Sequence, residues 1–110
     1  MIKVFNILQE LKVESLVILD IRERAAFSDY FVIGTILSTT HADRVIKTLA
    51  EDLEIKKGIC GVEGDEKSSW VLIDFGYFIL HLMNNEARDY YRLEYLWYRA
   101  PVVKLIRTPE

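Results

Sequence analysis

Two segments of the chain place apolar residues at the spacing of an α-helix. Residues 2–12 carry an apolar stripe between polar positions, which predicts a short amphipathic helix. A longer stripe over residues 42–53 predicts a second helix, and the hydroxyl side chains at 38–40 can cap its start. Two lysines followed by Gly58 suit its C-terminal end. The longer stripe consists of Ala42, Val45, Ile46, Leu49, Ala50 and Leu53.

Five other short runs are mainly apolar, as is typical of strands covered on both faces. Only Gly76 and Tyr77 separate the last two runs, so an antiparallel hairpin is their simplest pairing. The polar stretch 63–69 is expected to form a loop before this hairpin. The predicted strands span residues 15–21, 30–37, 59–62, 70–75 and 78–83.

The order of these elements predicts the fold. Helices before, between and after five strands indicate an α/β sandwich on a mixed five-stranded sheet. Asn85 is expected to cap a last helix over residues 86–91, with a short helical turn at 93–97 after it. A proline then ends the compact structure, so we expect one domain over residues 1–101 and a loosely ordered tail over residues 102–110.

Composition narrows the class of protein. The chain has 110 residues, of which 51% are hydrophobic, and this is enough for a packed core and argues against a disordered adaptor. One cysteine cannot form an internal disulfide, so we expect a reducing, cytoplasmic compartment. No apolar run approaches the roughly 20 residues of a membrane-spanning helix. The net charge of −3 argues against a protein that wraps nucleic acid and favours a basic protein partner.

The candidates for catalysis and metal binding are isolated polar residues. Asp20, Asp29, Asp74 and His81 could converge at strand ends around a divalent cation, but their spacing matches no metal motif, so structural roles are expected. His81 alternates with leucines, which favours a hydrogen-bonded histidine within a strand. Cys60 is expected to be a small buried side chain. No catalytic triad order, paired-cysteine motif or phosphate-binding loop is present, so we expect no catalytic residue, no metal and no cofactor.

The triplet Asp74-Phe75-Gly76 matches the magnesium-binding triplet of protein kinases. The chain has no glycine-rich phosphate loop and no His-Arg-Asp catalytic loop, and it is too short for a kinase fold. We therefore interpret the triplet as a hairpin turn whose sharpness requires Gly76.

Residues 90–98 hold five aromatic side chains in nine positions, more than one face of a short helix can bury. Tyr, Trp and Arg are enriched at the centres of protein interfaces, because they bury a large area and keep a polar group. The segment therefore indicates a docking surface, with part of it packed on the sheet. We expect Leu93, Leu96 and Trp97 to pack in the core, and Tyr90, Tyr91 and Tyr95 to face a partner.

A set of short motifs stands in order along the chain. They are Leu19-Asp20, Asp29 to Ile33, His41 at a helix start, Val62-Glu63-Gly64, Trp70 to Gly76, His81, and Arg88 to Trp97. In this order they resemble the ribosomal silencing factors (RsfS), also called Iojap-like proteins, over roughly residues 5–98.

The resemblance implies a fold like that of a reduced nucleotidyltransferase. It also implies a cytoplasmic protein that binds the large ribosomal subunit through ribosomal protein uL-fourteen, blocks joining of the small subunit and represses translation under nutrient limitation. The nucleotidyltransferase activity does not follow from the fold, because Asp20 and Asp74 each lack a paired aspartate two residues away. Two other hypotheses stay open: a vestigial magnesium-dependent nucleotidyltransferase that uses Asp20 and Asp74, and a homodimer.

The expected partner-binding residues lie on the edge of the 70–75 strand and on the aromatic helix. The aromatic residues are expected to anchor the partner, while Asp74 and Glu94 pair with its basic side chains. We expect no membrane contact and little or no direct contact with nucleic acid. The expected site residues are Trp70, Asp74, Tyr90, Tyr91, Arg92, Glu94 and Trp97.

Overall fold

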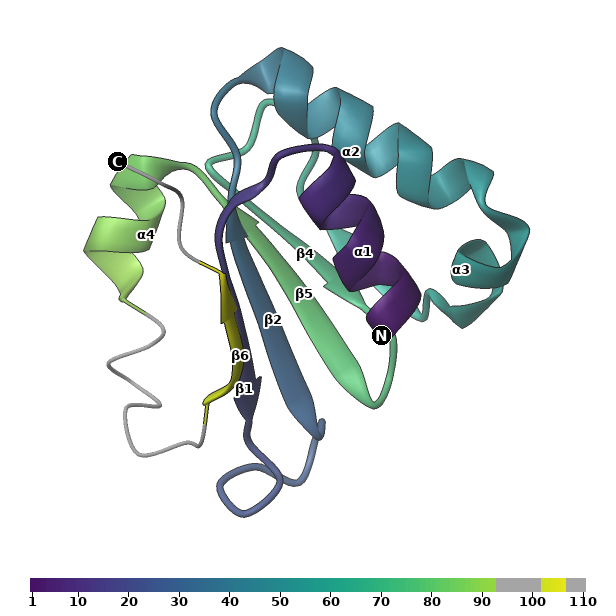
Figure 1. Cartoon of the computed structure of the whole chain (residues 1–110), viewed down its shortest axis with the longest axis vertical. Helices are drawn as coiled ribbons and strands as arrows, with labels where there is room; N and C mark the ends of the chain where they lie inside the picture. The colour runs from purple at the N-terminus through teal and green to yellow at the C-terminus, as the bar shows by residue number, and fades with distance from the viewer. Residues whose placement is uncertain (93–101, 107–110) are drawn as a thin grey trace.

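A mixed six-stranded sheet forms the centre of the protein in the computed structural model, which describes residues 1–92 and 102–106 (Figure 1). The strand order is β3-β4-β5-β2-β1-β6. β2 and β5 are parallel, and every other neighbouring pair is antiparallel. The strands are β1 (Glu14–Asp20), β2 (Tyr30–Thr35), β3 (Gly61–Glu63), β4 (Trp70–Asp74), β5 (Phe78–Met83) and β6 (Val102–Ile106). The α/β fold class and the five predicted strands are confirmed, and a sixth strand is added.

Helices cover the two faces of the sheet unequally. The helices are α1 (Ile2–Glu10), α2 (Thr39–Glu51), α3 (Leu53–Gly58) and α4 (Asn85–Tyr91). α1, α2 and α3 gather on one side of the sheet, and α4 lies away from them (Figure 1). The main core lies under the first three helices, where Leu8 of α1 and Val45 and Leu49 of α2 are fully buried against the strands.

A second, smaller core lies on the other face of the sheet. Val17, Phe31, Ile33 and Ile79 from three strands are buried there, together with Ala87 of α4. Trp70 and Leu72 of β4 pack against this cluster but stay only partly buried. Among the described residues, the β4 end of this face is therefore covered only in part.

The predicted long helix is in fact two helices that meet at Asp52. This residue has extended backbone angles (φ −81°, ψ 114°) and ends α2. Its carboxylate accepts hydrogen bonds from the backbone N–H groups of Glu54 (3.0 Å) and Ile55 (3.1 Å), so it caps α3. Lys3 of α1 pairs with the same carboxylate at 3.0 Å. An aspartate gains these bonds as a cap and not in a helix interior, which explains the break.

The expectation of a loosely ordered tail is wrong for Val102–Ile106, which forms β6. β6 pairs antiparallel with β1, with Ile18 opposite Lys104 and Val17 opposite Leu105. Without β6, β1 would be an edge strand with a row of unpaired backbone groups, and pairing satisfies them. Residues 107–110 and the helical turn expected at 93–97 lie outside the described residues.

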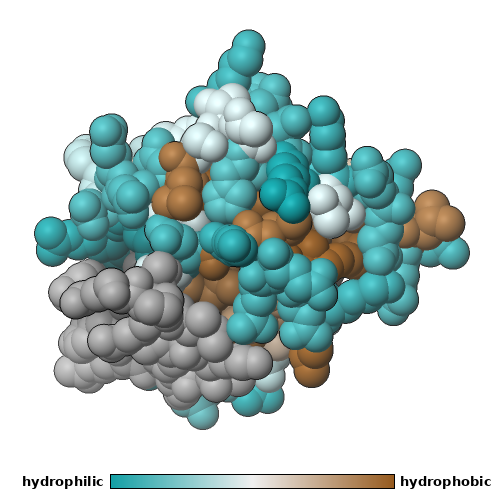
Figure 2. Space-filling view, turned by 45° about the horizontal axis from the view of Figure 1, so that its top comes forward, coloured by the Kyte–Doolittle hydropathy of each residue, from teal (hydrophilic) through white to brown (hydrophobic). Residues whose placement is uncertain are grey.

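Hydrophilic residues form most of the outline of the molecule in Figure 2, with an apolar area between them near the centre of that face. Side chains cap the starts of α2, α3 and α4; at the beginning of α2, the Ser38 hydroxyl accepts a hydrogen bond from the backbone N–H of His41 (3.0 Å). None of the helices in the described part of the chain has the length and apolar character needed to cross a membrane.

Candidate functional site

The alternation of side chains along β4 places three predicted or neighbouring site residues on one face of the sheet. Val71 and Ile73 point toward the helices and are buried, whereas Trp70, Leu72 and Asp74 point to the other face and are half-buried. Because the first three helices all lie on the opposite side, these three side chains are covered only in part. The hairpin with β5 fixes their register.

Trp70, Tyr91 and Tyr90 form a continuous row of aromatic rings, which we call the aromatic row. The Trp70 ring centre lies 4.6 Å from that of Tyr91, and Tyr91 lies 5.0 Å from Tyr90. Tyr91 is 44% exposed and Tyr90 is 82% exposed. The row therefore runs from a partly buried indole at the sheet edge to a solvent-exposed tyrosine on α4, and it presents the residue types that dominate interface energetics.

Two hydrogen bonds hold α4 where it completes the aromatic row. The Asn84 side chain accepts a hydrogen bond from the backbone N–H of Ala87 (2.8 Å), which caps the start of the helix. Arg88 donates to the hydroxyl of the buried Thr35 on β2 (2.9 Å) and so ties the helix to the sheet. The helix ends at Arg92, which has left-handed backbone angles (φ 47°, ψ 56°).

His81 lies beneath the indole of Trp70. The Trp70 Nε1–H donates a hydrogen bond to Nδ1 of His81 at 3.1 Å, and the edge of Phe31 contacts the imidazole with ring centres 4.5 Å apart. Burial lowers the pKa of His81 to about 4, so the ring is neutral at physiological pH. Since Nδ1 accepts, the proton of the neutral ring is assigned to Nε2. The predicted hydrogen-bonded strand histidine is confirmed.

A groove of about 350 Å³ borders the aromatic row and is lined by Glu63, Gly64, Trp70 and Leu72. Glu63 and Leu72 are register partners, so a carboxylate and an apolar side chain stand side by side on this face. Gly64 has a φ of +86°, and a Cβ there would lie 2.9 Å from the Trp70 carbonyl oxygen. Glycine therefore allows the chain after β3 to approach Trp70 closely.

The structure brings together three of the seven predicted site residues and places the others apart or leaves them undescribed. Asp74 lies at the far end of β4, four residues or roughly 13 Å from Trp70, and its carboxylate accepts a hydrogen bond from the backbone N–H of Gly76 (2.7 Å). Arg92 is turned back onto α4, where its Nε donates to the Asp89 carbonyl oxygen (2.9 Å). Glu94 and Trp97 lie outside the described residues.

The sequence did not predict Glu63 and Leu72 as residues of the site. It also did not predict that His81 accepts a hydrogen bond from Trp70. The alternation in Trp70-Val71-Leu72 already indicates that Leu72 shares a face with the indole. Pairing 70–75 with 78–83 around a two-residue turn also sets Leu72 opposite His81, as the structure shows. Glu63 reaches the site because β3 pairs with β4. A polar loop separates these two strands in the chain, and the sequence carries no comparable signal for their pairing.

The other candidate clusters do not assemble into a reaction centre among the described residues. Asp20 accepts two hydrogen bonds from the Arg22 guanidinium (3.0 and 2.6 Å), which lowers the pKa of its carboxyl group. Asp74 lies level with Leu19 but three strands away, roughly 14 Å across the sheet, so it and Asp20 cannot share one cation. The described residues contain no group of three side chains arranged to hold a metal ion.

The kinase-like triplet forms the predicted hairpin turn. Gly76 has a φ of +86°, and the backbone N–H of Phe75 donates to the carbonyl oxygen of Phe78 (2.9 Å).

Cys60 is exposed, which corrects the expectation of a buried thiol. The residue stands just before β3, at the sheet edge, where no helix covers it.

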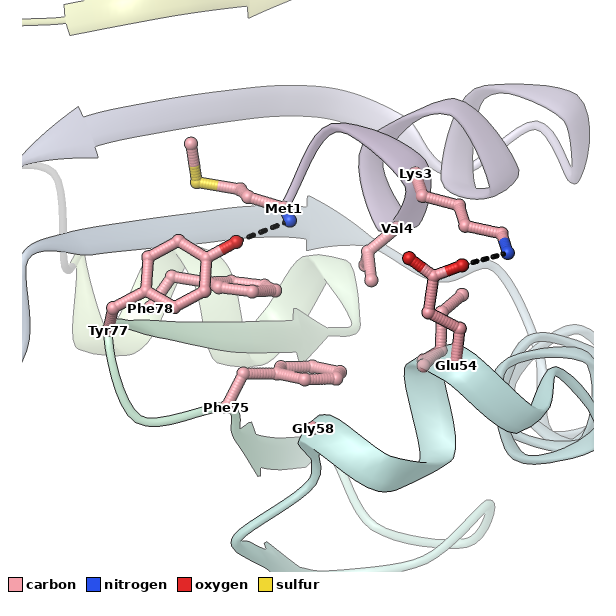
Figure 3. A pocket seen from close by; sticks show the side chains of 9 residues that line it. Met1, Lys3, Val4, Glu54, Gly58, Phe75, Tyr77 and Phe78 are labelled. Atoms are coloured by element: carbon pink, nitrogen blue, oxygen red, sulfur yellow. Dashed lines mark hydrogen bonds and ion pairs between the residues drawn. The ribbon is translucent and has the colours of Figure 1, made fainter.

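A second hollow lies at the opposite side of the sheet, between α1, α3 and the β4–β5 turn (Figure 3). It measures about 190 Å³, and the stacked rings of Phe75 and Phe78, 4.4 Å apart, form part of its wall. The Tyr77 hydroxyl accepts a hydrogen bond from the amino group of Met1 (2.6 Å). Lys3 pairs with Glu54 at 3.1 Å across its rim. This hollow joins the N-terminal helix to the hairpin.

Fold and site together define a class: a small α/β protein that presents an aromatic row and an adjoining groove at one edge of a mixed sheet. Within this class, the chain belongs to the ribosomal silencing factor family. The family model described as "Ribosomal silencing factor during starvation" matches residues 1–110.

Individual relatives agree with this family. The chain is 33% identical to the ribosomal silencing factor RsfS of Halalkalibacterium halodurans over 105 residues, which cover 91% of this chain and 86% of that protein. It is 29% identical over 96 residues to the mouse protein named mitochondrial assembly of ribosomal large subunit protein 1, covering 84% of this chain and 42% of that protein. A crystal structure of a Chromobacterium violaceum protein superposes with a TM-score of 0.78 at 25% identity, covering 97% of this chain and 84% of that chain.

Proposed function

We propose that this protein docks on the large ribosomal subunit in the cytoplasm and prevents the small subunit from joining, which represses translation when nutrients are limiting. Ribosomal protein uL-fourteen, at the face that meets the small subunit, is the proposed contact. Membership of the silencing-factor family supports the ribosomal partner. The single structural observation that carries the proposal is the aromatic row, in which Trp70, Tyr91 and Tyr90 lie in contact at an accessible edge of the sheet.

The aromatic row has the physical properties of an interface anchor. Its exposed rings bury a large area on docking, and each keeps a polar group that can bond to the partner. Trp70 is already fixed by its hydrogen bond to His81 and its contact with Tyr91, so little conformational freedom is lost when a partner binds. Glu94 and Trp97, which follow α4 in the sequence, remain part of the proposed surface.

The charge on this side of the protein favours a basic protein partner over ribosomal RNA. Glu63 lines the groove beside Trp70, and Asp74 stands on the same strand face. Glu86 and Asp89 are exposed on α4, where Arg88 and the C-cap residue Arg92 offset their charge, so Glu63 and Asp74 supply the excess negative charge. With the net charge of −3, these carboxylates attract Lys and Arg side chains and repel phosphate groups. This pattern supports a docking contact made through protein.

Co-sedimentation with purified large subunits tests the proposal. We expect the wild-type chain to sediment with the subunit, and Trp70→Ala to weaken binding by about 2 kcal/mol or more, roughly thirtyfold. Leu53→Ala is the control, because Leu53 is an exposed, large apolar residue on the helical side of the sheet, away from the aromatic row. Equal sedimentation of all three proteins, with the Trp70 variant folded, would show that the aromatic row is not the docking surface.

A second variant tests the acidic contribution without disturbing the turn. Asp74→Asn keeps an oxygen that can accept the hydrogen bond from Gly76 and removes only the charge. We expect weaker docking at low salt and a smaller difference at high salt, where charges are screened. Asp43→Asn on α2 is the control, since it removes the same charge from the opposite side. Identical salt dependence of the two variants would remove Asp74 from the docking surface.

A homodimer is a further part of the proposal. β3 ends the sheet on its outer side, and Val62 at its centre is half exposed, so a second copy could add to this edge. Such a dimer would cover the groove beside Trp70 and compete with the ribosome. Light scattering of the purified chain across a concentration series tests it: mass should rise with concentration, and a constant monomer mass would contradict it.

A further inference from the structure

Trp70 and His81 form a hydrogen-bonded pair that bridges two strands diagonally. In the β4–β5 hairpin, His81 stands opposite Leu72, while Trp70 stands opposite Met83, so the indole reaches back along the strand to the imidazole. The Nε1 to Nδ1 distance is 3.1 Å, and the ring centres are 5.7 Å apart. On its other side, the imidazole meets the edge of Phe31. The imidazole is therefore clamped between an indole and a phenyl ring.

Stability alone does not explain a histidine at this position. The side chain is only 3% exposed, and its Nε2 has no hydrogen-bond partner among the described residues. A buried polar atom without a partner lowers the stability of the fold, whereas an apolar side chain of similar size would not carry this cost. Among the described residues, the one hydrogen bond of the buried ring joins it to Trp70. The imidazole thus orients the indole through this hydrogen bond, while its unpaired Nε2 lowers the stability of the core.

We propose that His81 is a positioning residue for docking: its Nδ1 holds the Trp70 indole in the orientation that packs against Tyr91 and borders the groove at Glu63 and Leu72. This inference rests on the proposed function and adds a residue that does not itself touch the partner. Without the acceptor, the indole of a half-buried tryptophan at a sheet edge is free to turn its N–H toward water. The rotation would break the aromatic row, and a partner would then have to restore the orientation on binding.

Two variants of the same branched shape separate positioning from packing. His81→Asn keeps an acceptor oxygen at the place of Nδ1, whereas His81→Leu has a methyl group there. We expect the Asn variant to dock within about threefold of wild type and the Leu variant to dock about tenfold more weakly, the effect of one lost hydrogen bond. We expect the opposite order in stability, with the Leu variant unfolding at a higher urea concentration than the Asn variant, since it buries no unpaired polar group.

A spectroscopic measurement reports on the indole directly. The Trp70 Nε1–H resonance, identified by its absence in Trp70→Phe, should be protected from hydrogen exchange in wild type and in His81→Asn. In His81→Leu it should exchange quickly. This signal does not depend on ribosome binding, so it tests the orientation even if the docking surface lies elsewhere.

The outcomes distinguish the inference from the proposed function. If wild type fails to bind large subunits, the proposed function is wrong, and the indole resonance still decides whether His81 orients Trp70. If wild type binds and Trp70→Ala does not, but the Leu and Asn variants dock equally well, the positioning role is overturned. It is also overturned if docking follows stability across the variants or if the Leu variant fails to fold.

Discussion

The Trp70 ring on β4 and the Tyr91 ring on α4 lie 4.6 Å apart at an angle of 53°. This contact joins two elements that come from different parts of the chain, the central hairpin and the last described helix. Tilted aromatic pairs at this distance are stabilising beyond the area that they bury. The contact makes one surface out of a strand edge and a helix, and it links the stability of α4 to the docking function.

The energetic link between Trp70 and Tyr91 can be measured by a double-mutant cycle. Trp70→Ala, Tyr91→Ala and the double variant should give a coupling of about 1 kcal/mol in the free energy of unfolding, because each single change removes the same ring contact. Urea titration followed by circular dichroism measures it. The control cycle combines Trp70→Ala with Tyr90→Ala, and these two changes should be additive. Tyr90 is mostly exposed, and its ring contacts Tyr91. Strict additivity for Trp70 and Tyr91 would contradict the contact.

The pH dependence of stability should report the burial of His81. Its pKa is about 4 in the folded chain and near 6.5 when exposed. The unfolded chain therefore binds the proton first, so stability is fully present above pH 6.5 and falls by about 3 kcal/mol as the pH drops to 4. Urea titrations at pH 7, 6, 5 and 4 measure this loss.

His81→Leu is the matched control for the pH series, because it removes the imidazole and leaves every carboxylate in place. The unfolding free energy of this variant relative to that of wild type should rise by about 3 kcal/mol as the pH falls from 6.5 to 4, because only wild type has the buried imidazole. A constant difference over this range would mean that the imidazole titrates with an ordinary pKa and is not buried.

Substitution by alanine should have different effects at Gly64 and at Gly61, three residues before it. At Gly64 a Cβ would lie 2.9 Å from the Trp70 carbonyl oxygen, and the φ of +86° is strained for alanine. At Gly61 no atom lies within 4 Å of the added Cβ. We expect Gly64→Ala to lower stability by roughly 1 to 2 kcal/mol and to weaken docking, because it displaces the backbone that carries the indole. Gly61→Ala should change neither, and equal effects at both positions would contradict the close approach.

Removal of residues 102–110 should expose the outer edge of β1. That edge would lose the backbone pairing of Val17 and Ile18 with β6. An unpaired, apolar edge strand promotes association between chains, so we expect lower stability and a mass that rises with concentration. Light scattering and urea titration measure both quantities. A shortened chain that stays monomeric and equally stable would show that β6 contributes nothing to the sheet in solution.

Local sequence patterns predict much of the fold. The apolar stripe of α2, the buried run of β2 and the two runs around Gly76 each depend on neighbours in the chain, and each element is confirmed. The break at Asp52 was missed, because the stripe continues through it and the decisive capping bonds compete with a helical pattern that looks uninterrupted. β6 was missed because its pairing with β1 joins residues more than 80 positions apart.

The site was predicted less completely than the fold. Tyr90 and Tyr91 were predicted as site residues from residue type, since aromatic residues in excess of what a short helix can bury indicate a surface, and Trp70 was predicted as part of the 70–75 strand edge. The predicted 70–75 strand already places Asp74 at the end opposite Trp70, but the sequence did not show that its carboxylate would accept a hydrogen bond from Gly76. It also did not show the support of Trp70 by His81, which depends on the indole reaching diagonally across the hairpin to the imidazole.

The rate at which purified ribosomal subunits join tests the central claim most directly. Light scattering after mixing should show slower joining in a saturating excess of the wild-type chain, when it is added to large subunits before the small subunits. The Trp70→Ala variant should leave the rate nearly normal, and Leu53→Ala should slow it as wild type does. Joining at the ordinary rate in the presence of saturating, folded wild-type protein would contradict the account.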